Sequence, residues 1–182
     1  MTSETNEPER TRKDPVASLA GQIRHLGNGE RAELRRLDLT RSPTADGIIY
    51  GLLARAGVDF SQMRDDEMDA WRVTSLAAAT MSGSAGGGGH SPGRRMGQSL
   101  YHAGYSEARL MQLAGSPSHD RLVRAVRLLS KKGGGPFDLR MVRSLADPDP
   151  QTREAAAREL VRDYFTRSTR TTTPSTTEEK QP

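Results

Sequence analysis

Apolar residues recur at intervals of three and four along almost the whole chain, and this spacing most constrains the fold. Val16, Leu19, Ile23 and Leu26 follow one another in this way near the N-terminus. Such spacing places apolar side chains on one face of an α-helix, whereas a half-buried strand requires strict alternation. No alternating run of β-branched residues occurs in the sequence. The pattern therefore predicts an all-α protein.

Capping residues, glycines and prolines divide this pattern into separate helices. They predict a cap at Asn28, a start at Asp46, a stop at Gly57, and further starts at Ser116-Pro117 and Asp149-Pro150. The expected helical segments are 15–26, 29–37, 46–57, 65–81, 94–103, 106–114, 117–132, 138–146 and 150–167.

A glycine- and serine-rich stretch, residues 82–94, divides the helical part into an N-terminal half (15–81) and a C-terminal half (95–167). This composition is typical of a flexible loop. The two ends, residues 1–14 and 168–182, are polar and poor in apolar side chains, so we expect disordered tails. The predicted architecture is a helical bundle of two small halves joined by a Gly-rich loop.

Basic residues are concentrated in the C-terminal half. The chain carries a formal net charge of +4, but residues 94–170 alone hold fifteen basic and eight acidic side chains. A surplus of this kind indicates a polyanionic partner, nucleic acid first. The alternative is a solvated surface in an arginine-biased proteome, because arginine outnumbers lysine 23 to 4.

Two further features of the sequence bear on the compartment. No apolar run is long enough to span a membrane, and the first fourteen residues lack the apolar stretch of a secretory signal. The absence of cysteine excludes disulfides, a thiol nucleophile and cysteine-based metal sites. We therefore expect a cytoplasmic protein without a membrane partner.

The clearest candidate functional element is segment 117–132, which is apolar on one side and basic on the other. At about 100° per residue, the apolar side collects Leu122, Val123, Ala125, Val126 and Leu129. The opposite side collects Arg121, Arg124, Arg127, Lys131 and Lys132, with Leu128 near its edge, and we expect the first four of these cations to be largely exposed to solvent. Like charges at this spacing destabilise an isolated helix, so the row predicts a phosphate track. The alternative is a solvated face with extended side chains.

Other basic residues are weaker candidates for nucleic-acid binding. They are Arg31, Arg35 and Arg36 in GERAELRR, Arg109 in SEARLMQL, and Arg140 and Arg143 in DLRMVR. Taken alone, each of Arg109, Arg140 and Arg143 is more typical of an ordinary charged surface than of a binding site, and the first cluster is diluted by Glu30 and Glu33. Aromatic residues make up only 4% of the chain, which argues against a platform that stacks bases on exposed rings.

Enzyme motifs are missing from the sequence. The four histidines lie in separate segments, and the acidic group formed by Asp65, Asp66, Glu67 and Asp69 is explained by its place at a helix start. The stretch GGGGHSPGRR lacks the lysine and hydroxyl residue of a phosphate-binding loop, and no GxSxG occurs. We therefore expect a binding protein with no catalytic residue, no metal site and no cofactor.

Four stretches, taken in order, resemble one family. They are LGNGERAELRRLD, MGQSLYHAGYSEARLMQLAGS, RLVRAVRLLSKKGGGPFDLRMVRSL and AARELVRDYFTR. Together they resemble the CasB family, the small subunit of the type I-E CRISPR Cascade complex, over roughly residues 16–167. The chain departs from the family pattern at Leu139 and Arg140, where the family often has tryptophan, and Phe137 is expected to fill that space.

The resemblance implies a non-catalytic all-α protein that is present in two copies within a crRNA-guided complex. It implies contacts with the displaced DNA strand, with the guide–target duplex, and with the backbone and large subunits. The family's basic positions fall on Arg35, Arg36, Arg109, Arg124 and Arg127.

Two other functions are compatible with a basic helical protein. One is a free-standing DNA-binding regulator, whose recognition helix should present polar residues such as asparagine or glutamine to the bases. Segment 117–132 has neither, which favours contacts with the phosphate backbone. The other is a protein-interaction scaffold, in which the arginines meet acidic protein surfaces.

Overall fold

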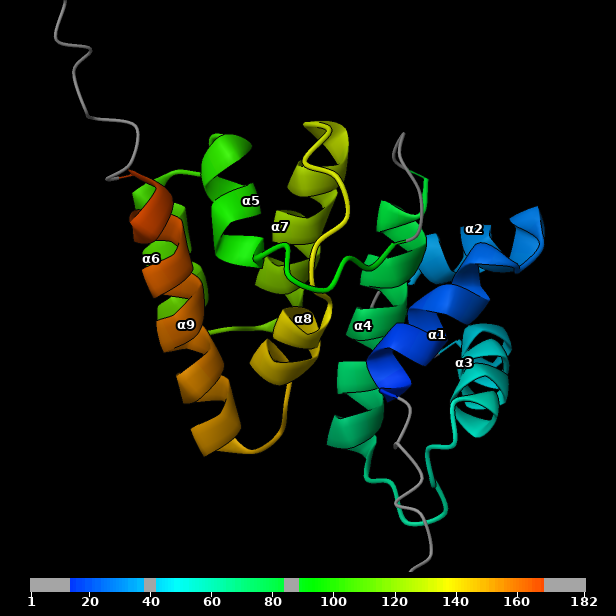
Figure 1. Cartoon of the computed structure of the whole chain (residues 1–182). Coiled ribbons are helices and arrows are strands. Elements are labelled where there is room, and N and C mark those ends of the chain that lie inside the picture. The colour runs from blue at the N-terminus through cyan, green and yellow to red at the C-terminus, as the bar shows by residue number, and fades with distance from the viewer. Residues whose placement is uncertain (1–13, 38–41, 84–88, 169–182) are drawn as a thin grey trace, which may run out of the picture.

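The computed structural model describes residues 14–37, 42–83 and 89–168, and every regular element in these ranges is an α-helix (Figure 1). The helices are α1 (Pro15–Arg24), α2 (Asn28–Arg36), α3 (Pro43–Arg55), α4 (Asp65–Met81), α5 (Met96–His102), α6 (Glu107–Gly115), α7 (His119–Lys131), α8 (Arg140–Leu145) and α9 (Pro150–Ser168). The all-α prediction is confirmed. Apart from Asp14 and Ser168, the two predicted tails lie outside the described residues.

The predicted helix ends are partly confirmed. Gly57 follows α3 with a φ of 76°, a conformation that favours glycine. Asp149 caps α9, because its carboxylate accepts a hydrogen bond from the Thr152 N–H at 2.8 Å. Helix α4 spans the predicted segment 65–81.

Three of the starts predicted from individual capping residues are wrong by one to three residues. Asn28 is the first residue of α2 rather than its cap, and the Gly27 N–H before it donates to the Glu30 carboxylate. Helix α3 begins three residues before Asp46, at Pro43, after the cap Ser42. Helix α7 begins after Ser118 rather than at Ser116-Pro117. In each case a nearby hydrogen-bonding group competes for the same role as the predicted cap.

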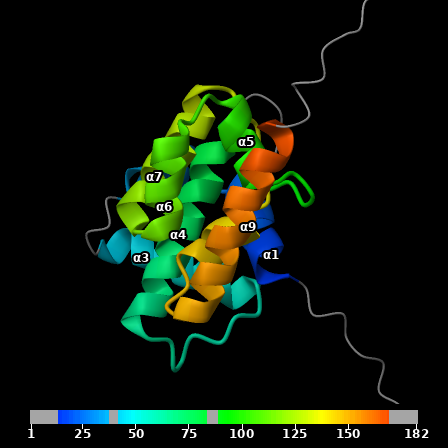
Figure 2. The ribbon, with the colours of Figure 1, turned by 90° about the vertical axis from the view of Figure 1, so that its left-hand side faces the viewer.

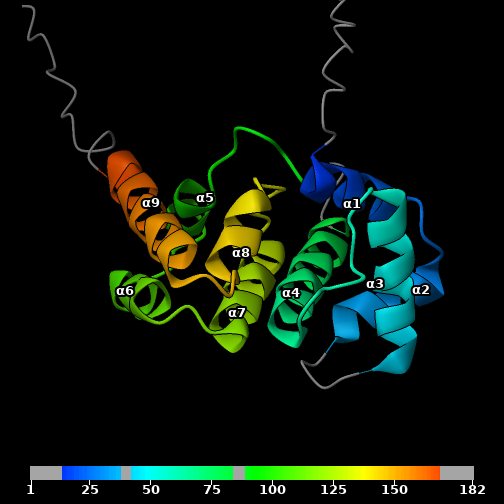
Figure 3. The ribbon, with the colours of Figure 1, turned by 90° about the horizontal axis from the view of Figure 1, so that it is seen from below.

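Helix α4 lies at the centre of the molecule, between α1–α3 on one side and α5–α9 on the other (Figures 1 and 3). Residues 70–79 are all buried, including the alanines 77–79. Helix α4 packs against α1 and α2 within its own half and against α7 and α8 across the division. A single apolar core therefore runs through both halves.

Arg72 is the one arginine among the described residues that is buried, with 6% of its surface exposed. Its guanidinium donates to both carboxylate oxygens of Asp46 on α3, at 2.8 and 2.7 Å, and also pairs with Asp69 one turn earlier on α4. These contacts raise the pKa of Arg72, and the hydrogen bonds with Asp46 are the largest cause. The pair fixes α3 against α4.

Helices α5 and α9 approach each other at Gly97. A Cβ atom at this position would lie 2.4 Å from the Leu160 carbonyl oxygen and 2.8 Å from the Tyr164 nitrogen, both in the backbone of α9. Two polar contacts flank the crossing. The Tyr164 hydroxyl donates to the Tyr105 carbonyl oxygen, and Arg95 pairs with the buried Asp163, each at 2.5 Å.

The second part of the Gly-rich stretch, residues 89–94, is tied to the segment before α8. The Ser91 N–H donates to the Phe137 carbonyl at 3.0 Å, and the Asp138 N–H donates to the Arg94 carbonyl at 2.8 Å. Residues 89–94 therefore make defined backbone contacts with the C-terminal half, and the flexibility of the Gly-rich loop stays a prediction. Phe137 is fully buried, as expected from the family resemblance of this segment.

His90 contributes a side-chain contact to the same region. The Leu139 N–H donates to His90 Nδ1 at 3.1 Å, so the imidazole is neutral there and carries its proton on Nε2. Only 6% of the side chain is exposed. Burial lowers the pKa of His90, and the nearby Asp138 carboxylate opposes this effect.

We expect the free energy of unfolding to fall as the pH falls below about 6.5, the pKa of a histidine in an unfolded chain. The folded pKa is lower, so above pH 6.5 the contribution of His90 is complete, and below it the unfolded chain binds the extra proton first. Urea unfolding at a series of pH values measures how steeply the free energy of unfolding changes with pH. His90→Asn keeps an acceptor but does not titrate, and should flatten this slope. An identical slope in both proteins would contradict the assignment.

Candidate nucleic-acid interface

Helix α7 presents two opposite faces, as its sequence predicts. The Ser118 hydroxyl accepts a hydrogen bond from the Arg121 N–H at 3.4 Å at its N-terminus. The buried residues of the helix are Leu122, Val123, Ala125, Val126 and Leu129, which are the five predicted ones. This face packs against α4, and the other face lies on the outside of the molecule beside α6 (Figure 2).

Three cations of the outer face are unpaired. Arg124, Arg127 and Lys131 are exposed, and their side chains form no hydrogen bond or ion pair with any described residue. We call these three residues the basic row. Lys132, which follows α7 as its C-cap, is also exposed. The predicted exposure of the row is confirmed.

Arg121 differs from the row because it is half-buried and engaged within the protein. Its Nη1 donates to the carbonyl oxygens of Gln112 and Ser116, at 3.4 and 2.7 Å. These carbonyls lie at the C-terminal end of α6, where a cation is favoured by the helix dipole. The expectation that Arg121 is largely exposed is therefore wrong, and its charge is held in a fixed position between α6 and α7.

Helices α6 and α7 enclose a hollow of about 350 Å³, which we call the arginine hollow. It is lined by Tyr105, Arg109, Gln112, Arg121, Arg124 and Leu128. Three predicted arginines thus meet from two helices, and no acidic residue is among the described residues that line the hollow. Leu128, predicted at the edge of the basic face, is half-buried and forms part of the wall.

The pKa of Tyr105 is affected both by burial and by the arginines of the hollow. Burial raises the pKa of its phenol, and the nearby guanidinium groups of Arg109 and Arg121 partly oppose this rise. Arg109 itself is exposed and forms no hydrogen bond or ion pair with a described residue. The hollow therefore carries positive charge that nothing in the described chain neutralises.

The three predicted arginines of α2 lie at the opposite end of the molecule from α6 (Figures 1 and 3). Arg31 donates to the Asn28 amide oxygen at 2.6 Å, and Arg35 Nε donates to the Ala79 carbonyl near the end of α4 at 2.9 Å. Arg36 is exposed and lies 4.0 Å from Glu33. None of these three arginines lines the arginine hollow between α6 and α7.

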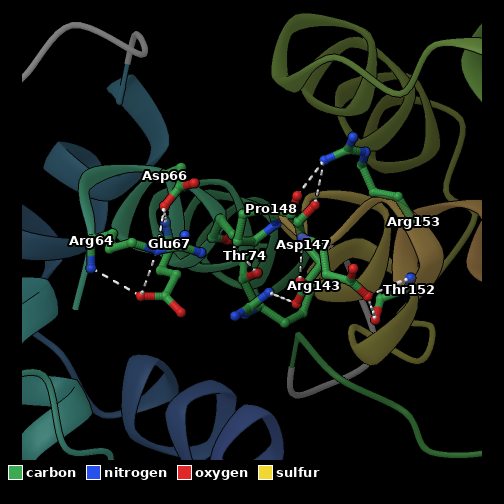
Figure 4. A network of polar contacts seen from close by, with 11 residues as sticks. Arg64, Asp66, Glu67, Thr74, Arg143, Asp147, Pro148, Thr152 and Arg153 are labelled. Atoms are coloured by element: carbon green, nitrogen blue, oxygen red, sulfur yellow. Dashed lines mark hydrogen bonds and ion pairs between the residues drawn. The ribbon is translucent and has the colours of Figure 1, made fainter. Parts of the chain in front are cut away.

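Arg140 and Arg143 are paired with carboxylates of the protein itself. Arg140 Nε lies 2.5 Å from Asp14, and Arg143 Nη1 lies 2.6 Å from Asp147. Figure 4 shows Arg143 and Asp147 pointing toward one another, and the Arg143 guanidinium also lies 5.1 Å from the centre of the Trp71 ring. Neither arginine lines the arginine hollow, and both stabilise contacts around α8.

The acidic group at the start of α4 lies where the sequence places it. Asp65, Asp66 and Glu67 form the first turn, and the Glu67 carboxylate accepts a hydrogen bond from the Arg64 N–H at 2.9 Å (Figure 4). Across the described ranges, no group of three or more histidine, aspartate or glutamate side chains is placed to hold a metal ion. Among the helices of these ranges, none combines the length and apolar character needed to cross a membrane.

Comparison with known proteins identifies the family. The family model for CRISPR-associated protein Cse2 matches residues 30–165, a span that includes the basic row and the whole arginine hollow. No curated protein and no solved structure matches the chain. The match agrees with the resemblance to CasB, the same family under another name. The chain therefore belongs to the Cse2 family and is a subunit of a CRISPR Cascade complex.

Proposed function

We propose that the chain is a non-catalytic subunit that binds nucleic acid without regard to sequence and stabilises the R-loop of a type I-E Cascade complex. Its ligands are the phosphates of the displaced DNA strand and of the duplex between crRNA and target. Its protein partners are the backbone and large subunits and a second copy of itself, in the cytoplasm. The target sequence is chosen by base pairing with the guide.

The observation that carries this proposal is the unpaired charge of α7. Arg124, Arg127 and Lys131 lie within two turns and lack an acidic partner among the described residues. Repulsion between like charges at this spacing costs stability in the free protein. Phosphates of a nucleic-acid strand relieve the repulsion, and the released counterions favour binding.

The contrast with Arg140 and Arg143 supports the assignment to α7. Those two arginines are neutralised by Asp14 and Asp147, so a phosphate would have to displace an existing partner. The basic row has no such competitor in the described chain. Segment 117–132 also lacks the amide side chains that read base edges, so its contacts position the strand rather than select it.

The Arg124→Ala/Arg127→Ala variant tests the proposal on the full chain. Its melting temperature should match the parent's, because each exposed site changes stability by no more than about 0.5 kcal/mol. Its affinity for single-stranded DNA should fall, and the dependence of log affinity on log salt should become shallower by about 0.7 for each phosphate that the variant no longer binds.

The matched control removes two exposed arginines from α9. Arg158 and Arg162 lie close to Glu154 and Glu159, at 3.3 and 3.8 Å, so their charge is already balanced. Arg158→Ala/Arg162→Ala should leave affinity and salt dependence unchanged. Equal losses of affinity in both double variants would show that only the net charge of the protein matters. An α7 variant with unchanged affinity would refute the assignment to the basic row.

A further inference from the structure

The arginine hollow has features that a track for phosphates does not require. A track needs exposed cations on a convex surface, and the basic row alone supplies them. The hollow adds a recess in which Leu128 and Tyr105 supply apolar surface beside the three arginines. Its volume of about 350 Å³ is near the lower end of pockets that hold small molecules. It is too small for a duplex and has the scale of one nucleotide.

We propose that the arginine hollow takes in one nucleotide of the bound strand, with its base turned out of the stack against Leu128 and Tyr105. Arg109 and Arg124, at the exposed rim, hold the phosphates on either side. This inference rests on the proposed function and names the part of the strand that the site accepts.

The chemistry of the wall suits any of the four bases. Every base has an apolar face that packs on aliphatic, aromatic or guanidinium surfaces, and such packing tolerates changes of sequence. Gln112 supplies one amide that both donates and accepts hydrogen bonds, and its side chain forms no hydrogen bond with a described residue. The hollow therefore holds a base without selecting it, which agrees with a guide-directed complex.

Two of the residues that line the hollow are already held by hydrogen bonds in the free protein. The carbonyls of Gln112 in α6 and of its C-cap Ser116 hold Arg121, and the Tyr105 carbonyl accepts a hydrogen bond from the Tyr164 hydroxyl of α9 at 2.5 Å. Because these groups are already ordered before binding, little free energy is lost in ordering them when a base binds. The side chains of Arg109 and Arg124 are exposed and have no partner in the described chain, which suits groups that close over a strand.

The test compares two single strands of equal length and charge, an oligothymidylate and its fully abasic counterpart, on the full chain. If the hollow holds a base, the abasic strand should bind at least about tenfold more weakly, while the salt dependence of the two affinities stays the same. If phosphates alone are bound, the two strands should bind equally.

A variant of the wall locates the effect. Leu128→Asn removes the aliphatic part of the wall without changing charge, and it should bring the two affinities closer together while leaving the abasic affinity unchanged. Met111→Asn is the matched control, because Met111 is an apolar residue of α6 that is 55% exposed and lies outside the hollow. It should keep the full difference between the strands.

The outcomes separate this inference from the function on which it rests. Binding of both strands with equal affinity refutes the nucleotide site and leaves the phosphate track intact. Binding of neither strand refutes both. A difference between strands that is undiminished in Leu128→Asn places the base elsewhere and overturns the assignment to the arginine hollow.

Discussion

The Gly97→Ala variant is expected to lose about 3 kcal/mol of its free energy of unfolding, the upper part of the usual range for overpacking. The added Cβ would lie 2.4 Å from one backbone atom of α9 and 2.8 Å from another. Backbone atoms cannot rotate away as a long side chain can, so α5 and α9 have to separate. The loss would occur although alanine favours a helix by about 1 kcal/mol over glycine.

Gly21→Ala is the matched control for this experiment. Gly21 also lies within a helix, α1, and a Cβ there would meet nothing within 4 Å. This variant should therefore gain about 0.5 to 1 kcal/mol from helix propensity alone. Urea unfolding measures both changes. A gain in both variants would show that α5 and α9 are not in backbone contact at position 97.

The second large effect is expected for Asp46→Ala, which removes the partner that binds Arg72 through two oxygens. The Arg72 side chain is 7% exposed, and its guanidinium would retain only Asp69 as a partner. Removing one partner of a buried ion pair costs about 3 to 5 kcal/mol, because the remaining charge is poorly solvated. Urea unfolding should show a loss near the lower end of that range, since Asp69 remains.

Asp66→Ala is the control for the buried pair. Asp66 lies 3.4 Å from Arg64, and both side chains are more than half exposed, so its removal should cost less than about 1 kcal/mol. A double variant, Asp46→Leu/Arg72→Met, should lose less than Asp46→Ala, because no charge remains buried. Equal losses in the Asp46 and Asp66 variants would contradict the role of the pair.

Local patterns were sufficient for the helices and for the two faces of α7. The acidic residues from Asp65 begin a helix, and Gly57 ends one, through interactions with residues next to them in the sequence. The spacing of Leu122 and Val126 likewise determines which face of α7 is buried. Cap positions were predicted less accurately. Gly27 and Asn28 lie side by side, and small differences in free energy decide which of them caps α2.

Which arginines are free could not be read from the sequence. Arg140 is paired with Asp14, 126 positions away, whereas Arg124 has no partner in the described chain, and both occur in similar sequence surroundings. The convergence of Arg109 with Arg121 likewise depends on how α6 turns back onto α7. Buried Arg72 was missed because nothing near it in the sequence distinguishes it from an exposed arginine.

The burial of α4 on all sides has a consequence for how the chain acquires and keeps its structure. A fragment that ended before α5 would expose the surface of α4 that α7 and α8 cover, and a fragment that began at α5 would lack that surface altogether. Neither part retains its core alone, so the two are expected to melt in one cooperative transition rather than in two steps. A destabilising substitution in α2 is therefore expected to lower the protection of α7 amides from hydrogen exchange, although the two helices belong to different halves.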